Sequence, residues 1–317
     1  MSSPAFPDLA AAMKASLESF ESVRRTVPEL PSGAFPAPSL VAWMEWATKA
    51  GVPAVPVECK AVLNIDALMR FERAQESDLP VLEALARCNQ ERPDGFMLRW
   101  DCCAPYGIKA SMGHPRPDGA PLSDPEDLVL IVDDPRACDL IYEFPSESIA
   151  VLQRPWAAVR QWEGFPIEFR VFVRKGAVCG ISNYYPQRSL PDTPEIRQWA
   201  AQSGQAAQLI VDTAKAANAY PWMGFPRGIP EEYQRGFEAT LDFCVTQEGE
   251  VLFLEAGPGV GLGAHPCCFY LEDEGRTLPV EGLRLGVSNP NPEESPVPVA
   301  DPGWGSSISP VVVLPGL

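Results

Sequence analysis

The sequence predicts an α+β fold, and the order of its segments is the main reason. Short apolar strands between residues 95 and 185 are followed by one long helical region and then by another strand hairpin. Strands, a helix and more strands in this order are typical of α+β or mixed α/β architectures. The chain has 317 residues, of which 46 % are hydrophobic, so it can bury a substantial core in two or three subdomains.

The first 90 residues carry helical patterns. Apolar residues at helical spacing predict helices over Asp8–Arg25, Ser39–Ala50 and Leu79–Gln90, separated by proline-rich connectors such as PELPSGAFPAP. We expect residues 1–90 to form an accessory segment that precedes the main domain.

From Gly95 onward short strands replace the helical patterns. The runs GFMLRW, DLVLIV and IAVLQRPW predict strands, and PIEFRVFV turns at Arg174-Lys175-Gly176 and returns as AVCGISNYY. Thr193–Tyr220 then has apolar residues at helical spacing and predicts one long helix. We expect residues 91–275 to form the main domain. Residues 276–317 are dense in proline, which favours an extended coil over a further domain.

The composition excludes some partners. A net charge of −17 argues against a surface that holds a nucleic-acid backbone, but a small anion such as a nucleotide needs only a few well-placed cations. The start MSSPAFPDLAAAMKASLESF has no secretory pattern, and no apolar run approaches the roughly 20 residues of a membrane span. We therefore expect a cytoplasmic protein with no membrane partner, whose nine cysteines are reduced thiols.

The stretch LDFCVTQEGEVLFLEAGPG, residues 241–259, places an acid in each strand of a predicted hairpin. A tight turn centred on Glu248-Gly249 puts Asp242 directly opposite Glu255 on one face. Two like charges in that position are destabilising unless a shared proton or a bound cation compensates them. The alternative is that both acids simply face solvent on an exposed hairpin.

Three cations elsewhere could complete a site. In PIEFRVFV, strand alternation places Arg170 in mid-strand, either pairing outward with Glu168 or serving as a phosphate ligand. In GFMLRWDCCAPYGIKASMG, Arg99 ends a strand and Lys109 follows a loop; each taken alone is an ordinary surface cation. Two arginines, a lysine and an opposed carboxylate pair are together what a Mg²⁺-triphosphate site requires. The common phosphate-binding pattern GxxxxGK[ST] is absent from the sequence.

The order of FMLRW…IKASMG, IEFRVFVRKGAVCGISNYY and LDF…LFLEAGPG resembles the ATP-grasp superfamily. It is most similar to the bacterial and phage clade named for two arginines and one lysine, and to the related eukaryotic cell-division-cycle proteins that assist assembly of a translation initiation factor. The resemblance covers residues 95–266, a little over half of the chain. It implies an ATP-grasp fold, in which two α+β subdomains clasp a nucleotide, with ATP and Mg²⁺ as cofactors.

The resemblance also implies roles for individual residues. Arg99 and Lys109 would contact the phosphates from the first subdomain, and Arg170 would reach the terminal phosphate, which makes Arg170 and Lys109 the catalytic candidates. The strand VLQRPW, residues 151–156, would border the adenine, with Arg154 as a further candidate for nucleotide binding.

Asp242 and Glu255 would be the metal-binding acids, in agreement with the hairpin argument. One position departs from the family pattern, because members usually have an asparagine two residues after the second acid and this chain has Gly257. The departure puts a second metal ion in doubt.

The resemblance favours an ATP-dependent ligase that phosphorylates a carboxylate for attack by an amine or thiol. An ATP-binding assembly factor with little turnover is the first alternative, and nucleotidyl transfer to an RNA or protein end is the second. The sequence carries no signature for the acceptor, and the acidic surface is a disadvantage for a nucleic-acid acceptor.

Overall fold

The structure is a computed structural model, and it confirms the α+β class. The fold has two halves, and each half is a sheet with helices packed on one face. The described residues are 27, 29–72, 79–104, 135–162, 164–184, 190–191, 193–222, 237–258, 272–273, 276–277, 283–286 and 311–314. None of the described helices is both long enough and apolar enough to cross a bilayer.

A small antiparallel sheet forms one half of the fold, with strand order β2-β4-β3. Its elements are β2 (Glu58–Asn64), α3 (Ile65–Glu72), α4 (Leu79–Gln90), β3 (Phe96–Trp100), α6 (Pro135–Tyr142) and β4 (Ser148–Pro155). Alternate residues of β3 and β4, including Leu98 and Trp100, form a buried cluster with residues of the three helices. The intervening residues, Arg99 among them, therefore point to the opposite face of the sheet.

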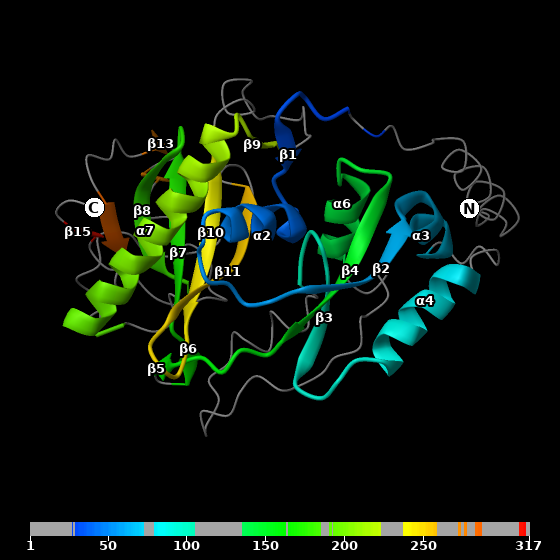
Figure 1. The fold of residues 1–317 in the computed structure, drawn as a ribbon, viewed down its shortest axis with the longest axis horizontal. Coiled ribbons are helices and arrows are strands. Elements are labelled where there is room, and N and C mark those ends of the chain that lie inside the picture. Colours follow the sequence, from blue (N-terminus) through cyan, green and yellow to red (C-terminus); the bar gives the residue numbers. More distant parts are fainter. Residues whose placement is uncertain are drawn as a thin grey trace, which may run out of the picture.

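A larger six-stranded sheet forms the other half, with strand order β11-β10-β7-β8-β14-β15 (Figure 1). Its elements are β7 (Glu168–Arg174), β8 (Ala177–Asn183), α7 (Pro194–Ala216), β10 (Ala239–Val245), β11 (Val251–Pro258), β14 (Leu283–Gly286) and β15 (Val311–Leu314). Odd-numbered residues of β7 and β10, such as Phe169 and Phe243, form the main core with residues of α7 and of α2 (Leu40–Lys49). The even-numbered residues of both strands are thus left for the other face.

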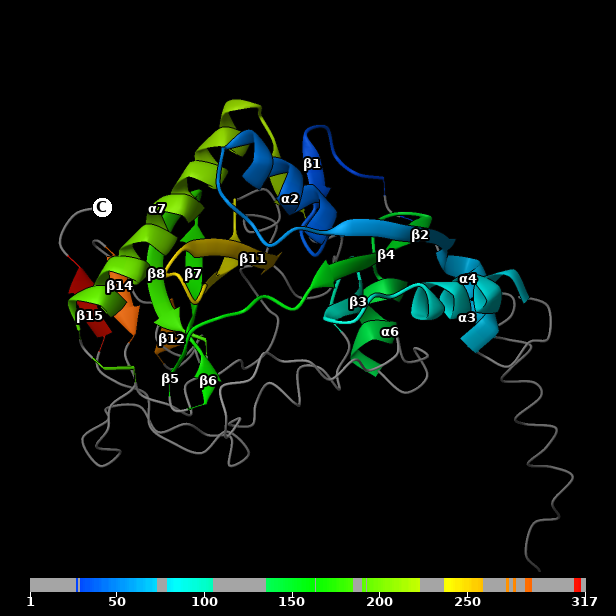
Figure 2. The same ribbon diagram turned by 60° about the horizontal axis from the view of Figure 1, so that its bottom comes forward.

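Residues from the first 90 positions contribute to both halves. β1 (Ala34–Pro36) pairs in parallel with β9 (Tyr220–Trp222), α2 packs on the large sheet, and β2 pairs with β4 in the small sheet. Figure 2 shows α2 beside α7 and β2 leading away to the small sheet. The domain boundaries stay a prediction, but residues 34–72 and 79–90 share sheets and cores with the rest of the described chain. Two-residue strands complete the list: β5 (Gln161–Trp162), β6 (Phe165–Pro166), β12 (Glu272–Asp273) and β13 (Arg276–Thr277).

Several predicted elements are confirmed closely. The predicted helix over Ser39–Ala50 is α2, with Ser39 as its N-cap, and the predicted helix over Leu79–Gln90 is α4. The turn between β7 and β8 has positive φ at Lys175 and Gly176, as a two-residue hairpin loop requires. The predicted helix over Asp8–Arg25 and the DLVLIV strand lie outside the described residues.

Other predictions were wrong in extent. α7 ends at Ala216 rather than near Tyr220, because Asn218 takes a left-handed conformation with φ 54° and the chain then enters β9. The expected coil after residue 275 contains β14 and β15, which extend the large sheet from β8. Both are short aliphatic runs, LRLG and VVVL, that lie between prolines and can therefore make ladder hydrogen bonds.

Asp101 ties the small sheet to α2. It follows β3 directly, its carboxylate accepts hydrogen bonds from the Ser39 hydroxyl and the Val41 N–H, both at 2.8 Å, and its own carbonyl accepts from the Leu40 N–H at 3.1 Å. These donors belong to the N-terminus of α2, where N–H groups have no partner within the helix. Burial raises the pKa of the Asp101 carboxyl, and the hydrogen bond from Val41 is the largest opposing effect.

We expect Asp101→Ala to lower the free energy of unfolding by about 1–3 kcal/mol, because it leaves buried donors at the start of α2 without an acceptor. Asp101→Asn keeps one side-chain acceptor and should lose less. Urea unfolding followed by circular dichroism measures both. Equal losses in the two variants would mean that the hydrogen bonds to α2 do not stabilise the fold.

Candidate functional site

The two acids of the second hairpin face each other as predicted. Asp242 on β10 is paired with Glu255 on β11. The turn, however, is one residue longer than expected: Val245 pairs with Val251 and the Thr246 N–H donates to the Glu250 carbonyl at 2.8 Å. Gly249 has φ 87°, as the last residue of a three-residue hairpin loop requires.

A β-bulge next to the acids restores the predicted pairing. The register shifts between Asp242 and Phe243, which leaves Leu254 of β11 as the extra residue. Such bulges re-aim side chains and often lie beside functional sites. The acid pair therefore depends on a turn and a bulge whose effects on register cancel at this position.

Arg170 neutralises the first acid. It lies on β7 directly opposite Asp242, and its guanidinium donates from Nε to Oδ1 at 2.8 Å and from Nη2 to Oδ2 at 2.7 Å. The Asp242 side chain is only 2 % exposed, so the pair is nearly dry. The guanidinium also packs over the Tyr184 ring, 4.7 Å from its centroid. The sequence interpretation considered Glu168 as a partner for Arg170 and missed Asp242.

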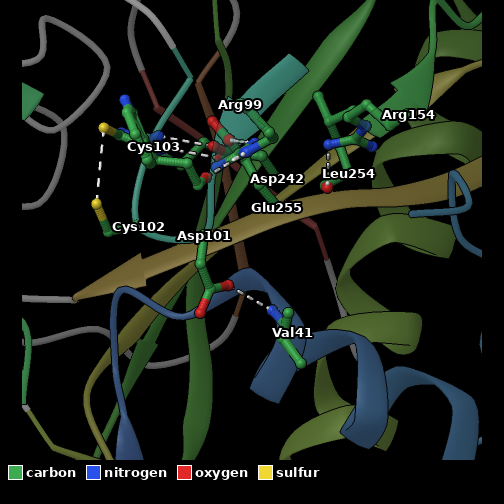
Figure 3. A network of polar contacts seen from close by, with 11 residues as sticks. Val41, Arg99, Asp101, Cys102, Cys103, Arg154, Asp242, Leu254 and Glu255 are labelled. Carbon is green, nitrogen blue, oxygen red and sulfur yellow. Dashed lines mark hydrogen bonds and ion pairs between the residues drawn. The ribbon is translucent and has the colours of Figure 1, made fainter. Parts of the chain in front are cut away.

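Arg99 neutralises the second acid from the other half of the fold. Its Nη1 lies 2.6 Å from the Glu255 Oε2, with the side chains 4 % and 16 % exposed (Figure 3). Burial lowers the pKa of Arg99, but the charge and hydrogen bond of Glu255 outweigh this effect and leave the pKa above its ordinary value. This ion pair joins β3 of the small sheet to β11 of the large sheet.

Arg154 is a third buried guanidinium at the same place. It lies on β4, opposite Met97, so it shares the face of the small sheet that carries Arg99. Its Nη1 donates to the Leu254 carbonyl at 3.0 Å, while its Nη2 is buried without a hydrogen-bond partner. Burial, followed by the nearby charge of Arg99, lowers the pKa of Arg154 to about 10. A buried cation with an unused donor is suited to receive an anion.

The donor set fits a hard divalent cation. Within the described part of the chain, no three His, Cys, Asp or Glu side chains are arranged to hold a metal. A cation between Asp242 and Glu255 would therefore complete its shell with waters and ligand oxygens, as Mg²⁺ commonly does. Cys244 lies on the same strand face two residues from Asp242, but burial raises its pKa to about 12, so it stays a neutral thiol.

The structure brings five of the six predicted site residues together. Arg99, Arg154, Arg170, Asp242 and Glu255 converge on one place between the two sheets, whereas Lys109 lies outside the described residues. Gly257 is on the Glu255 face of β11, opposite Thr240, and a Cβ there would lie 3.6 Å from the Thr240 Oγ1. Sequence reasoning missed Tyr184, which the alternation of β8 alone does not connect to Arg170.

Comparison with known proteins gives distant structural similarity only. No protein-family model matches the chain, and no curated protein is similar to it in sequence. The fold is similar to Cdc123 from Schizosaccharomyces pombe, with 12 % identity over 69 % of this chain and 82 % of that chain and a TM-score of 0.40.

Two further structures are similar at comparable levels. A RimK domain ATP-grasp protein from Sphaerobacter thermophilus has 13 % identity over 71 % of this chain and 59 % of that chain, with a TM-score of 0.33. The D-alanine-D-alanine ligase from Coxiella burnetii has 12 % identity over 70 % and 47 % of the two chains, with a TM-score of 0.32.

We expect Arg154→Met to leave the ligand-free protein at least as stable as the wild type while weakening the ATP binding that the family resemblance implies. Methionine fills a similar volume and removes a buried charge that has no carboxylate partner at ion-pair distance among the described residues, a change that is often neutral or stabilising. Thermal unfolding without ligand and calorimetric titration with ATP give the two values. A variant that loses stability and keeps its affinity would show that Arg154 has a structural role only.

Proposed function

We propose that the chain is an ATP-grasp protein that binds Mg-ATP where the two sheets meet and acts as a ligase. In this proposal it phosphorylates a substrate carboxylate, which an amine or thiol then attacks. The observation that carries the proposal is the pair of opposed acids, Asp242 and Glu255, each held by an arginine from a different strand. The family resemblance of the strands that bear these residues supports it.

The charges of the site suit a metal triphosphate. Three guanidiniums face two carboxylates, and the buried Glu168 lies near Arg154. The acids would take the metal and the arginines the phosphate oxygens, so each charge would have a partner of opposite sign. The three arginines and three acids sum to zero, so Mg-ATP, with four negative and two positive charges, would bring the set to −2, and a further cation such as Lys109 would bring it closer to neutral. Bidentate guanidinium contacts are well suited to phosphate.

The residues of the chain would act mainly by positioning and neutralisation. Bound Mg-ATP supplies the phosphoryl group that activates the carboxylate. Arg170 would hold the terminal phosphate while Tyr184 limits the freedom of its guanidinium, and Arg99 and Arg154 would hold the phosphates from the small sheet. Fixing these cations on strands reduces the reorganisation needed when charge develops on the transferred group.

A second candidate function is an ATP-binding assembly factor with little turnover, and Gly257 favours it. This glycine provides no side-chain oxygen beside Glu255, and the described residues hold no group of three His, Cys, Asp or Glu side chains that could bind a metal. A site with one weakly held metal can bind a nucleotide and still transfer its phosphate slowly.

Asp242→Asn combined with Glu255→Gln should abolish the Mg²⁺-dependent part of the thermal stabilisation by ATP. The two changes remove the proposed protein ligands of the metal and little volume. ATP in EDTA should stabilise the double variant at least as well as the wild type, because Arg99 and Arg170 lose their competing carboxylates. Differential scanning fluorimetry with and without Mg²⁺ measures both effects, and circular dichroism checks the fold. Mg-ATP stabilisation that persists in full would refute the metal assignment.

A turnover assay separates the ligase from the assembly factor. We expect ADP release with Mg-ATP to be slow alone and faster with one of a panel of amino acids, peptides and cell-extract fractions. Gly257→Asn should raise the rate, since the position opposite Thr240 has room for a side chain that adds a metal ligand. Ala256→Asn is a control for the added side chain on the other face of β11; because Ala256 packs against the main core, circular dichroism must first show that this variant is folded. Tight Mg-ATP binding with background ADP release throughout would favour the assembly factor.

A further inference from the structure

Both carboxylates of the proposed metal site are already occupied by guanidiniums. Both oxygens of Asp242 accept from Arg170, at 2.8 and 2.7 Å, and one oxygen of Glu255 accepts from Arg99 at 2.6 Å. A divalent cation that coordinated either acid in this arrangement would approach a fixed positive charge within a few ångströms. The repulsion would be strong because the ion pairs are largely buried.

The arginines cannot leave by losing a proton. A guanidinium stays charged at physiological pH and cannot be deprotonated in proteins. A guanidinium drawn off its carboxylate would become a buried unpaired charge unless another anion received it. The phosphate chain of a nucleotide is such an anion, and its oxygens match the same planar fork of donors.

We propose that Arg99 and Arg170 are resident counter-ions that the metal and the phosphate chain must displace together, so that cation and nucleotide bind with strong positive coupling. The inference rests on the proposed function of the site and adds its regulation. A metal ion alone would bind weakly because the carboxylates are paired with arginines. A nucleotide alone would bind weakly because the same arginines are paired with the carboxylates. When both bind, the acids exchange arginine for metal, the arginines exchange carboxylate for phosphate, and every buried charge keeps a partner.

Arg154 supports this view by contrast. It is buried among the same strands, but its Nη1 donates to the backbone carbonyl of Leu254, and its Nη2 has no hydrogen-bond partner. It can therefore meet a phosphate without breaking an ion pair. The site thus has one guanidinium ready for an anion and two that are released only when the acids find another cation.

The coupling predicts that removal of an arginine from either ion pair tightens the binding of a metal ion. Arg170→Gln should remove the guanidinium that occupies both oxygens of Asp242. It should therefore tighten the binding of Mn²⁺ alone by about tenfold or more, measured by loss of the free-ion electron paramagnetic resonance signal. Arg99→Gln should do the same through Glu255. The matched control is Arg87→Gln, which removes an equal charge from an exposed position on α4. It should bind Mn²⁺ as weakly as the wild type.

The coupling also predicts that removal of a carboxylate tightens the binding of metal-free nucleotide. Asp242→Asn should remove the carboxylate charge that competes with phosphate for Arg170. It should therefore tighten the binding of ATP in EDTA by a similar factor of about ten, measured by isothermal titration calorimetry. Mn²⁺ binding to wild type that equals binding to folded Arg170→Gln and Arg99→Gln would overturn the proposal. So would unchanged affinity for metal-free ATP in Asp242→Asn.

Failure of the coupling and failure of the proposed function give different results. Wild type that binds Mg-ATP tightly, with no gain of Mn²⁺ binding in either arginine variant, would leave the nucleotide function standing and overturn only the coupling. Wild type that binds no Mg-ATP would overturn the proposed function, and with it the coupling. If Arg170→Gln does not fold, Arg99→Gln and Asp242→Asn decide the outcome.

Discussion

Two carboxylates held opposite each other on neighbouring strands are the constraint on which the rest of the site depends. Asp242 and Glu255 face each other across β10 and β11 in a low-dielectric interior, so they would repel each other strongly if no cation paired with them. Two guanidiniums from different places neutralise them. Arg170 pairs with Asp242 from the next strand of the same sheet, and Arg99 pairs with Glu255 from the other sheet. The second ion pair couples the chemistry of the site to the arrangement of the two halves, because Arg99 reaches Glu255 only while β3 stays beside β11.

β3 serves that arrangement through simple alternation. Leu98 and Trp100 point into the helix-covered core of the small sheet, while Arg99 and, just past the strand end, Asp101 point the other way. Arg99 contacts β11 and Asp101 holds the N-terminus of α2, which itself packs on the large sheet. Two charged residues two positions apart thus fasten the small sheet to the large one, and each is desolvated to do so. Loss of the cap at α2 would be felt at Glu255 because both contacts position the same strand.

The sequence predicted local structure well and long-range pairing in part. The helices that begin after Ser39 and Thr193 were predicted from the helical spacing of apolar residues, and the opposition of Asp242 and Glu255 was predicted from hairpin geometry. The acids are opposed only because a longer turn shifts the register by one residue and a bulge shifts it back. The sequence indicated neither the longer turn nor the bulge. β2 was missed because ECKAVLN is mostly exposed and does not alternate cleanly. The partners of Arg170 and Arg99 were not predictable, since no short turn links β7 to β10 or β3 to β11 and therefore no loop length sets their register.

The identity of the cations also has a physical reason. A lysine opposite Asp242 could satisfy the charge, but it would be a single point of attachment and could lose its proton on burial. Arg170 uses two parallel hydrogen bonds, stays charged, and presents its planar face to Tyr184. A guanidinium so placed can exchange one planar pair of oxygens for another without being lost from the site. The same features that make the ligand-free ion pairs stable thus make a multivalent oxyanion accompanied by a metal ion the natural competitor for them.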